Sequence, residues 1–288
     1  MTLEKLKTYF IKEISGQYSE AESKILFEVF TEKFLELNTI QQRAQKQLKL
    51  SAPQTALFER AISELRSGKP YQQILGEAEF FGLKFFVDEN VLIPRPETEE
   101  LLELAIEKIK KFGAKRPNFS VLDIGTGSGI IPIMLKKHFP EAEISALDFS
   151  KNALKIARKN ADFHNVEINF MHQNYLEENL TEAYDVIISN PPYIGIEEED
   201  EIAASVKEFE PKMALFSPTS NALVFYEKIA KDCRKNLSAN GMVFLEINQK
   251  LGKETSELFT DVLSEVELVK DISGNERFVW GLKLQDEG

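Results

Sequence analysis

The chain has few residues of the kinds that form disulfides and metal sites. Its 288 residues include one cysteine, Cys233, and three histidines, His138, His164 and His172. One cysteine excludes an internal disulfide, and the histidines lack the close spacing of metal ligands. We therefore expect no metal, and we interpret Cys233, in "KIAKDCRKNL", as a packed helix residue rather than a nucleophile.

Long apolar runs are also missing. No stretch contains the ~18 uninterrupted apolar residues of a membrane span, and the opening "MTLEKLKTYF" carries three charges, unlike a signal peptide or an anchor. We expect a cytoplasmic protein with no membrane partner. With 43% hydrophobic residues, a chain of this length can form one large domain and one small one.

Basic residues are outnumbered by acidic ones. The 35 lysines and arginines face 47 aspartates and glutamates, and the resulting net charge of -12 opposes non-specific binding to DNA or RNA. We expect a monomer that makes no direct contact with nucleic acid. The densest acidic run, "EEEDE" at 197–201, is interpreted as a solvated loop and helix start; the alternative is a surface that meets a basic partner.

The first part of the chain has helical periodicity. Apolar residues recur at helical spacing in two sets: Leu3, Leu6, Phe10 and Ile14, and then Ile25, Leu26, Val29, Phe30 and Phe34. A further helix is predicted from Pro53 to Gly68. We predict a helical domain over residues 1–75 that recognises the substrate, followed by a β-hairpin linker over 76–95 with its turn at Gly82.

The pattern changes in the remaining residues, 96–288. Short apolar strands, "SVLDIG", "EISALD", "INFMH", "DVIIS" and "GMVFLEI", alternate with amphipathic helices, which predicts an α/β domain with a doubly wound, mostly parallel sheet. The closing "VELVKDISGNERFVWGLKL" has two strand-like runs with no room for a crossover helix, so we expect an antiparallel hairpin there. The prediction is a sheet of seven strands.

A glycine-rich turn follows the first of these strands, in "VLDIGTGSGI" at 121–130. Gly125, Gly127 and Gly129 permit a tight turn and let a ligand approach the backbone closely. Their G-x-G-x-G spacing differs from the G-x-G-x-x-G of dinucleotide-binding turns. With Asp123 before it, the stretch resembles motif I of class I S-adenosylmethionine-dependent methyltransferases.

A second signal is Asp148, in "ISALDFS", nineteen residues beyond Gly129. It ends the next predicted strand, where a carboxylate can accept hydrogen bonds from both ribose hydroxyls of a nucleoside. The alternative role, capping the following helix, is weaker because Ser150 fits that cap better.

The third signal is "DVIISNPPYIG" at 185–195, in which two prolines must end a buried strand at Asn190. Asn190 to Tyr193 matches the [N/D]-P-P-[Y/F] motif of methyltransferases that act on planar nitrogens: adenine N6, cytosine N4 or a glutamine amide. We predict that the Asn190 side-chain oxygen and the Pro191 carbonyl each accept one N–H of the target. Pro192 stiffens the turn, and Tyr193 stacks on the target plane.

Most of the chain resembles the HemK/PrmC family of N5-glutamine methyltransferases, which modify the Gly-Gly-Gln loop of peptide-chain release factors. The resemblance runs from "GKPYQQILGEAEFFGLKFFVDENVLIPRPETEELLELA" through "LDIGTGSGI", "ALDFSKNAL" and "DVIISNPPYI" to "PKMALF". The "VLIPRPETE" segment, 91–99, joined to NPPY is specific to this family. It suggests that Arg95 and Glu97 bind substrate; the alternative is a linker stiffened by Pro94 and Pro96.

The resemblance implies a class I methyltransferase fold, S-adenosylmethionine as methyl donor and a release factor as substrate. The residues it assigns to the donor site are Asp123, Gly125, Thr126, Gly127, Ser128, Gly129, Asp148, Asn174, Tyr175 and Asn190, and those it assigns to catalysis are Asn190, Pro191, Pro192 and Tyr193. Three positions depart from the family pattern. Asn174 stands where an aspartate is usual, Gln73 replaces a tyrosine, and Asn248 replaces the glycine of a Glu-x-Gly.

Two alternatives share parts of this pattern. An adenine-N6 methyltransferase of DNA or RNA would carry the same glycine turn and NPPY, but it would also need a basic, aromatic target-recognition region, which this acidic sequence lacks. A catalytically silent binding module would retain the fold alone. The intact Gly125, Gly127, Gly129, Asp148 and Asn190 argue against the second alternative.

Overall fold

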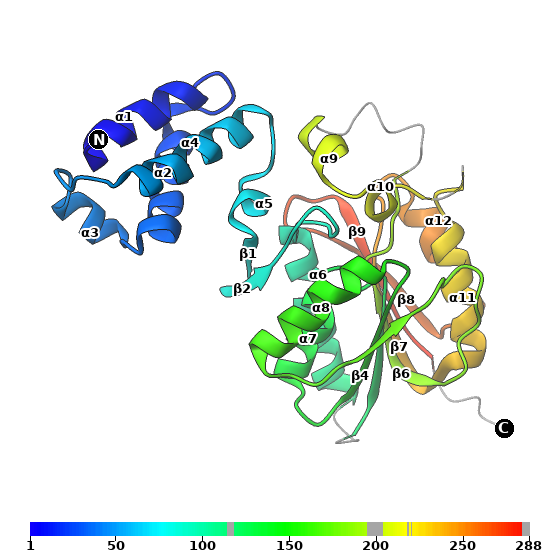
Figure 1. Cartoon of the computed structure of the whole chain (residues 1–288). Helices are drawn as coiled ribbons and strands as arrows, with labels where there is room; N and C mark the ends of the chain where they lie inside the picture. Colours follow the sequence, from blue (N-terminus) through cyan, green and yellow to red (C-terminus); the bar gives the residue numbers. More distant parts are fainter. Residues whose placement is uncertain (114–117, 195–203, 218, 220, 284–288) are drawn as a thin grey trace. The chain divides into compact units, whose positions relative to one another are not determined.

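The computed structural model describes residues 1–113, 118–194, 204–217, 219 and 221–283. The acidic run at 197–201 lies outside these residues. The chain divides into two compact units, one formed by residues 1–77 with helix α9 (Ala204–Phe209), the other by residues 78–202 and 210–288. Figure 1 shows both units along the colour-coded chain.

The first unit is helical, as expected. Its elements are α1 (Leu3–Ile14), α2 (Glu20–Leu35), α3 (Thr39–Ala44), α4 (Ala52–Arg66) and α5 (Tyr71–Leu75). Side chains of Ser19, Asn38 and Ser51 cap three of the helices, each in a reciprocal capping box with the residue three positions later. Inside, the rings of Phe10, Phe27, Phe30, Phe34 and Phe58 pack against one another.

The predicted apolar faces of these helices are only partly correct. Leu3, Leu6, Phe10 and Ile14 are all buried in α1. In α2, however, Ile25 is 62% exposed, and Phe27 occupies the core position instead. Successive helical residues are rotated by about 100°, so Ile25 cannot share a face with both Leu26 and Phe30. Helix α4 ends at Arg66, two residues before Gly68.

A two-stranded hairpin follows, made of β1 (Glu77–Phe80) and β2 (Leu83–Phe86). Its turn residues Phe81 and Gly82 have φ of 51° and 68°, so the turn lies where the sequence predicts it. The side chain of Asn160 holds the hairpin to α8 (Lys151–His164), since it accepts from the Phe86 N–H and donates to the Phe86 carbonyl.

The second unit is built on a seven-stranded sheet in the order β5-β4-β3-β6-β7-β9-β8. The strands are β3 (Ser120–Ile124), β4 (Glu143–Asp148), β5 (Asn169–His172), β6 (Tyr184–Ser189), β7 (Leu237–Glu246), β8 (Glu265–Lys270) and β9 (Glu276–Leu282). The first five in this spatial order are parallel, and β9 runs antiparallel between β7 and β8. The predicted fold class is confirmed, including the antiparallel C-terminal hairpin.

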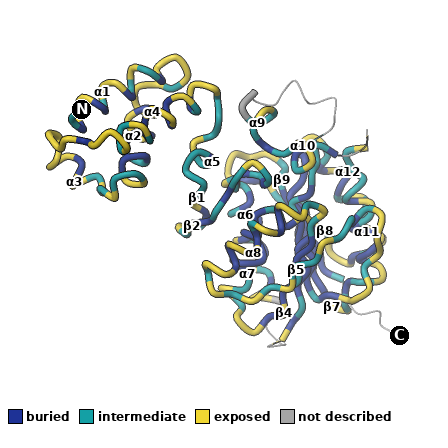
Figure 2. The backbone as a smooth tube through the Cα atoms, viewed as in Figure 1, coloured by how far each residue is buried: buried dark blue, intermediate teal, exposed yellow. Residues whose placement is uncertain are grey.

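Helices cover both faces of this sheet (Figure 1). The remaining elements are α6 (Pro96–Lys108), η1 (Ile109–Gly113), α7 (Ile130–His138), α10 (Lys212–Leu215), α11 (Val224–Asn236) and α12 (Gly252–Glu257). Along β7, Met242 and Phe244 join the core beneath α6 and α7, whereas Val243 and Leu245 join the core beneath α11. Figure 2 shows these central strands as the most buried part of the chain.

The single cysteine lies in the core of the second unit. Cys233 is buried in the core cluster beneath α11, as the interpretation of a packed helix residue requires, and its burial raises the pKa of the thiol to about 12. In the described part of the chain, none of the helices has the length and apolar character needed to cross a membrane.

The packing of α7 on α8 leads to a prediction about Gly129. This residue has a φ of 81°, and an added Cβ would lie 3.0 Å from the Cβ of Ala157. We expect Gly129→Ala to lower the free energy of unfolding by about 2–4 kcal/mol, from backbone strain plus the close contact. Chemical denaturation of the purified protein measures this loss.

Gly274 provides the matched control, because its φ is 87° but an added Cβ would meet open space. Gly274→Ala should cost only the strain, about 1–2 kcal/mol. Equal losses in the two variants would contradict the packing argument.

Candidate active site

The carboxyl ends of four parallel strands meet at one edge of the sheet. Ile124 of β3 pairs with Leu147 of β4 and with Ser189 of β6, and Ser189 pairs in turn with Leu245 of β7. The next residue of each strand is therefore at a common level: Gly125, Asp148, Asn190 and Glu246. Ligands of doubly wound sheets bind at this edge.

The glycine turn is fixed from the neighbouring strand. The Gly125 and Thr126 N–H groups both donate to the Leu147 carbonyl, at 3.0 Å each. The Gly127 N–H donates to one oxygen of Asp148 at 2.9 Å, and the Ser150 N–H donates to the other at 2.7 Å. Asp148 thus orders the turn as well as facing the edge.

The helix after Asp148 is capped as the sequence suggested. The Ser150 hydroxyl accepts the N–H of Ala153 and is the N-cap of α8. Asp148 is free of that role. Burial raises the pKa of Asp148, against the lowering effect of the hydrogen bonds from Ser150 and Gly127.

Asp123 is the least satisfied polar group at this edge. Its carboxyl is fully buried, and neither oxygen has a hydrogen-bond partner among the described residues. Burial raises its pKa to about 7; the nearby Thr126 hydroxyl opposes this rise without forming a hydrogen bond, and the Asp148 charge adds to it. A buried carboxyl of this kind is costly unless a ligand completes its environment.

A pocket of about 710 Å³ opens beside these residues. That volume lies within the usual range of small-molecule sites. The predicted site residues that line it are Arg95, Gly125, Thr126, Gly127, Ser128, Asp148, Asn174, Tyr175, Asn190 and Pro192. The predicted residues Asp123, Gly129, Pro191, Tyr193 and Glu97 are not among its lining residues.

Several lining residues were not among the site residues predicted from the sequence, although all but Phe225 lie in the segments that carry the family resemblance. They include Leu92, Thr98, Phe149, Met213, Phe216 and Phe225. The segment after NPPY brings part of this wall into place, because Ile194 forms a parallel bridge with Phe216, donates its N–H to Leu215 and accepts the N–H of Ser217. These contacts join segments distant in sequence, which local patterns cannot reveal.

The NPPY segment is anchored at both ends by side chains. The Asn190 amide nitrogen donates to the Thr98 hydroxyl at 3.1 Å. The Tyr193 hydroxyl donates to Glu246 at 3.3 Å, and the Tyr193 ring packs against the core cluster beneath α11. Its stacking on a target therefore remains a prediction.

Glu246 ends β7 and is buried. Burial raises its pKa to about 7, against the lowering effects of the Thr98 hydrogen bond and of the Arg277 charge. A polar residue at the carboxyl end of a parallel strand is the same signal that pointed to Asp148 and Asn190, and it could have pointed to Glu246 as well.

The three departures from the family pattern have identifiable contacts. Asn174 lines the pocket, and its N–H donates to Glu178 at 2.8 Å. The Gln73 side chain donates to the Phe209 carbonyl within the helical unit. The Asn248 side chain donates to the Tyr193 carbonyl at 3.2 Å, a contact that a glycine cannot make.

Arg95 is a lining residue of the pocket, whereas Glu97 is not. The Arg95 guanidinium donates to Glu210 at 2.5 Å, and the other Glu210 oxygen accepts the N–H of Ile93. Arg95 therefore fixes the pocket wall as well as lining the pocket. Binding of substrate by either residue remains a prediction.

A family model described as "Methyltransferase small domain" matches residues 104–209. Two solved structures share the fold. A methyltransferase from Pyrococcus furiosus superposes with a TM-score of 0.51 at 17% identity, over 79% of this chain and 100% of that one. A 16S rRNA methyltransferase from T. Thermophilus, in complex with AdoMet and guanosine, superposes with 0.51 at 19% identity, over 72% and 49%.

The fold and the glycine turn at its edge define a class I S-adenosylmethionine-dependent methyltransferase. Curated relatives narrow this further. The release factor glutamine methyltransferase of Flavobacterium psychrophilum is 42% identical over 97% of this chain and 98% of that protein, and that of Streptococcus pneumoniae is 39% identical over the same shares. The chain belongs to the release factor glutamine methyltransferase family.

The residues present fit S-adenosylmethionine. Asp123 supplies a buried carboxyl that still lacks a partner among the described residues, and no described atom beyond the adjacent residues lies within 4 Å of a Cβ added at Gly125 or Gly127. Backbone at the turn is therefore open to a ligand. Residues Gly125 to Ser128, Asp148, Asn174 and Tyr175 would line the site.

The position of Asp148 leads to a prediction on donor binding. Asp148→Ala should weaken the affinity for S-adenosylmethionine about 10- to 100-fold, because it removes charge-assisted hydrogen bonds and loosens the turn at Gly127. Isothermal titration calorimetry measures this change.

Asp185 is a suitable control, since it ties β3 to β6 through Ser120 and is not a lining residue of the pocket. Asp185→Ala should keep the parental affinity. Equal affinities of the Asp148→Ala and parental proteins would contradict the assignment.

Proposed function

We propose that this chain transfers a methyl group from S-adenosylmethionine to the side-chain nitrogen, N5, of the glutamine in the Gly-Gly-Gln motif of peptide-chain release factors. The main supporting observation is that Asn190 lines the pocket with its side-chain nitrogen bound to Thr98, which leaves its side-chain oxygen to accept a hydrogen bond. The chain also matches release factor glutamine methyltransferases over nearly its whole length. In the proposed reaction one N–C bond forms, one S–C bond breaks, S-adenosylhomocysteine is released, and the nitrogen loses one proton.

The chemical obstacle is the delocalised lone pair of an amide nitrogen. The Asn190 side-chain oxygen and the Pro191 carbonyl are proposed to accept its two N–H groups, which orients the nitrogen and favours its electron-rich, pyramidal form. When bound, S-adenosylmethionine supplies an electrophilic methyl group. The methylated nitrogen is acidic, so its proton leaves without a strong general base.

The apolar pocket wall assists this chemistry. Leu92, Phe216 and Phe225 line the same pocket as Asn190 and limit the access of water. In surroundings of low polarity, the hydrogen bonds to the target amide are stronger than they would be in water. Pro192 restricts the backbone that carries Asn190.

Substrate identity requires contacts beyond the target side chain. A glutamine side chain is too small to identify its owner, so binding energy must come from a remote surface. The helical unit has its own core and is proposed to provide that surface. We further propose a cytoplasmic monomer that acts on protein and makes no direct contact with nucleic acid, consistent with the net charge of -12.

Asn190→Ala should lower kcat by about 10²-fold or more, because it removes one preorganised acceptor at the reacting nitrogen. Affinity for S-adenosylmethionine should change little, and calorimetry checks this. Single-turnover transfer of labelled methyl to a purified release factor measures the rate. Asn165 offers a control: it ends α8 on the surface, so Asn165→Gly should leave the rate unchanged.

The product gives the most direct test of the proposed function. Peptide mapping by mass spectrometry should place one added methyl on the glutamine of the Gly-Gly-Gln peptide after reaction with purified release factor. Parallel reactions with DNA and RNA, followed by nucleoside analysis, should give no methyladenine. Methyladenine together with an unmodified Gly-Gly-Gln peptide would favour an adenine methyltransferase instead.

A further inference from the structure

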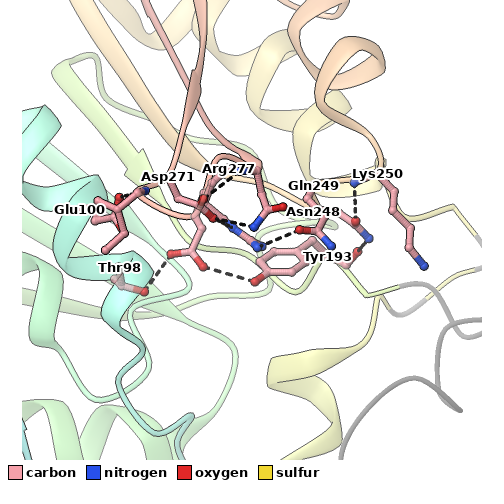
Figure 3. A network of polar contacts seen from close by, with 11 residues as sticks. Thr98, Glu100, Tyr193, Asn248, Gln249, Lys250, Asp271 and Arg277 are labelled. Carbon is pink, nitrogen blue, oxygen red and sulfur yellow. Dashed lines mark hydrogen bonds and ion pairs between the residues drawn. The ribbon is translucent and has the colours of Figure 1, made fainter.

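Glu246 accepts two hydrogen bonds, one from Tyr193 at the end of the NPPY segment and one from Thr98, which in turn accepts from Asn190 at its start. One carboxylate oxygen accepts from the Thr98 hydroxyl at 2.8 Å, and the other accepts from the Tyr193 hydroxyl at 3.3 Å. Figure 3 draws these two hydrogen bonds as dashed lines that reach Thr98 and Tyr193. Thr98 and Glu246 are 3% and 1% exposed, so water does not compete for these bonds.

The hydrogen bond from Thr98 to Glu246 determines what Thr98 can do toward Asn190. A threonine hydroxyl has one proton to donate and can also accept. Since its proton is directed to Glu246, the hydroxyl can only accept from its other neighbour. That neighbour is Asn190, 3.1 Å away, which must therefore present its NH₂ group to Thr98.

This arrangement determines which end of the Asn190 amide remains for a ligand. With its nitrogen on Thr98, the amide leaves its oxygen available, and Asn190 lines the pocket. If the amide were turned by 180°, it would offer N–H groups to the N–H groups of a target amide, and the two would repel. The proposed chemistry works in only one of the two orientations.

The rest of the network holds Glu246 itself. The Tyr226 hydroxyl donates to the Glu246 backbone carbonyl at 3.0 Å. Burial raises the pKa of the Glu246 carboxyl, and the Arg277 charge opposes this rise. Arg277 is paired with Asp271 at 3.3 Å and donates to Gln249, as Figure 3 shows. Glu246 is thus fixed at both its backbone and its side chain.

We propose that Thr98 and Glu246 are positioning residues that lock the Asn190 amide with its oxygen toward the acceptor nitrogen. Glu246 imposes this orientation through Thr98 and holds Tyr193 with its second oxygen. Neither residue touches the reacting atoms. The inference rests on the proposed function only for the identity of the group that receives the methyl.

Thr98→Val tests the lock, because valine has nearly the shape of threonine but no hydroxyl. We expect kcat to fall about 10- to 100-fold, since Asn190 is then free to turn, while KM for S-adenosylmethionine changes less than about twofold. Thr98→Ser keeps the hydroxyl and should recover most of the lost turnover. Single-turnover and steady-state assays on release factor measure both.

Thr255 gives a matched control for the loss of a buried hydroxyl. It is fully buried in α12, away from the pocket lining, and its hydroxyl has no partner among the described residues. Thr255→Val should leave kcat unchanged. A Thr98→Val enzyme that folds and turns over at the parental rate would overturn the proposal.

A double-mutant cycle tests the part played by Glu246. Glu246→Gln has one acceptor oxygen for two donors, so it should lower kcat about 10-fold in the parental protein. In a Tyr193→Phe background only the Thr98 donor remains, and the same change should cost less than about threefold. Equal costs in both backgrounds would show that Glu246 does not connect the two ends.

A direct readout separates this inference from the proposed function. In protein labelled with ¹⁵N-asparagine, the Asn190 side-chain NH₂ signals, assigned by their absence in Asn190→Ala, should shift in Thr98→Val and stay near their parental positions in Thr98→Ser. Signals that are identical in the parental and Thr98→Val proteins would refute the lock. Failure of the parental enzyme to methylate release factor would refute the proposed function alone, because the spectra need no substrate.

Discussion

The in-register pairing of four parallel strands is the constraint on which the site depends. Because Ile124, Leu147, Ser189 and Leu245 lie at one level, the next residue of each strand reaches the same edge. These residues supply a turn open to a ligand, a carboxylate that orders this turn, and an amide and a carboxylate at the place where we propose that the reaction occurs. A slip of one residue in any pair would turn the corresponding side chain to the other face.

The same edge concentrates buried carboxyl groups, which is unfavourable for stability. Asp148 accepts two backbone N–H groups and Glu246 accepts two hydroxyls, so each recovers part of its lost hydration. Asp123 has no such partner among the described residues. The unsatisfied group lies beside the turn that is expected to bind the donor, where a ligand can complete its environment, as is usual for functional sites.

The NPPY motif places Asn190 but does not determine which end of its side-chain amide faces the pocket. The motif provides an amide in a stiff backbone, but an asparagine side chain has two ends of nearly equal shape and opposite hydrogen-bonding character. Its orientation is set by Thr98, which lies 92 residues away along the chain, and by Glu246. The proposed selectivity for an N–H donor therefore depends on three elements: α6, the segment after β6, and β7.

The sequence by itself determined the helical first unit, the seven strands, the glycine turn, Asp148 at a strand end and the end of β6 before Asn190. These features depend on local periodicity, on glycine and proline geometry and on the residue types at strand ends, all of which are visible in short windows. Only the tertiary structure decided that Ile25 faces solvent, that β9 lies between β7 and β8, and that Thr98 and Glu246 meet the NPPY segment. These outcomes depend on strand register and on side-chain contacts between distant segments, and such contacts leave no periodic trace in the chain.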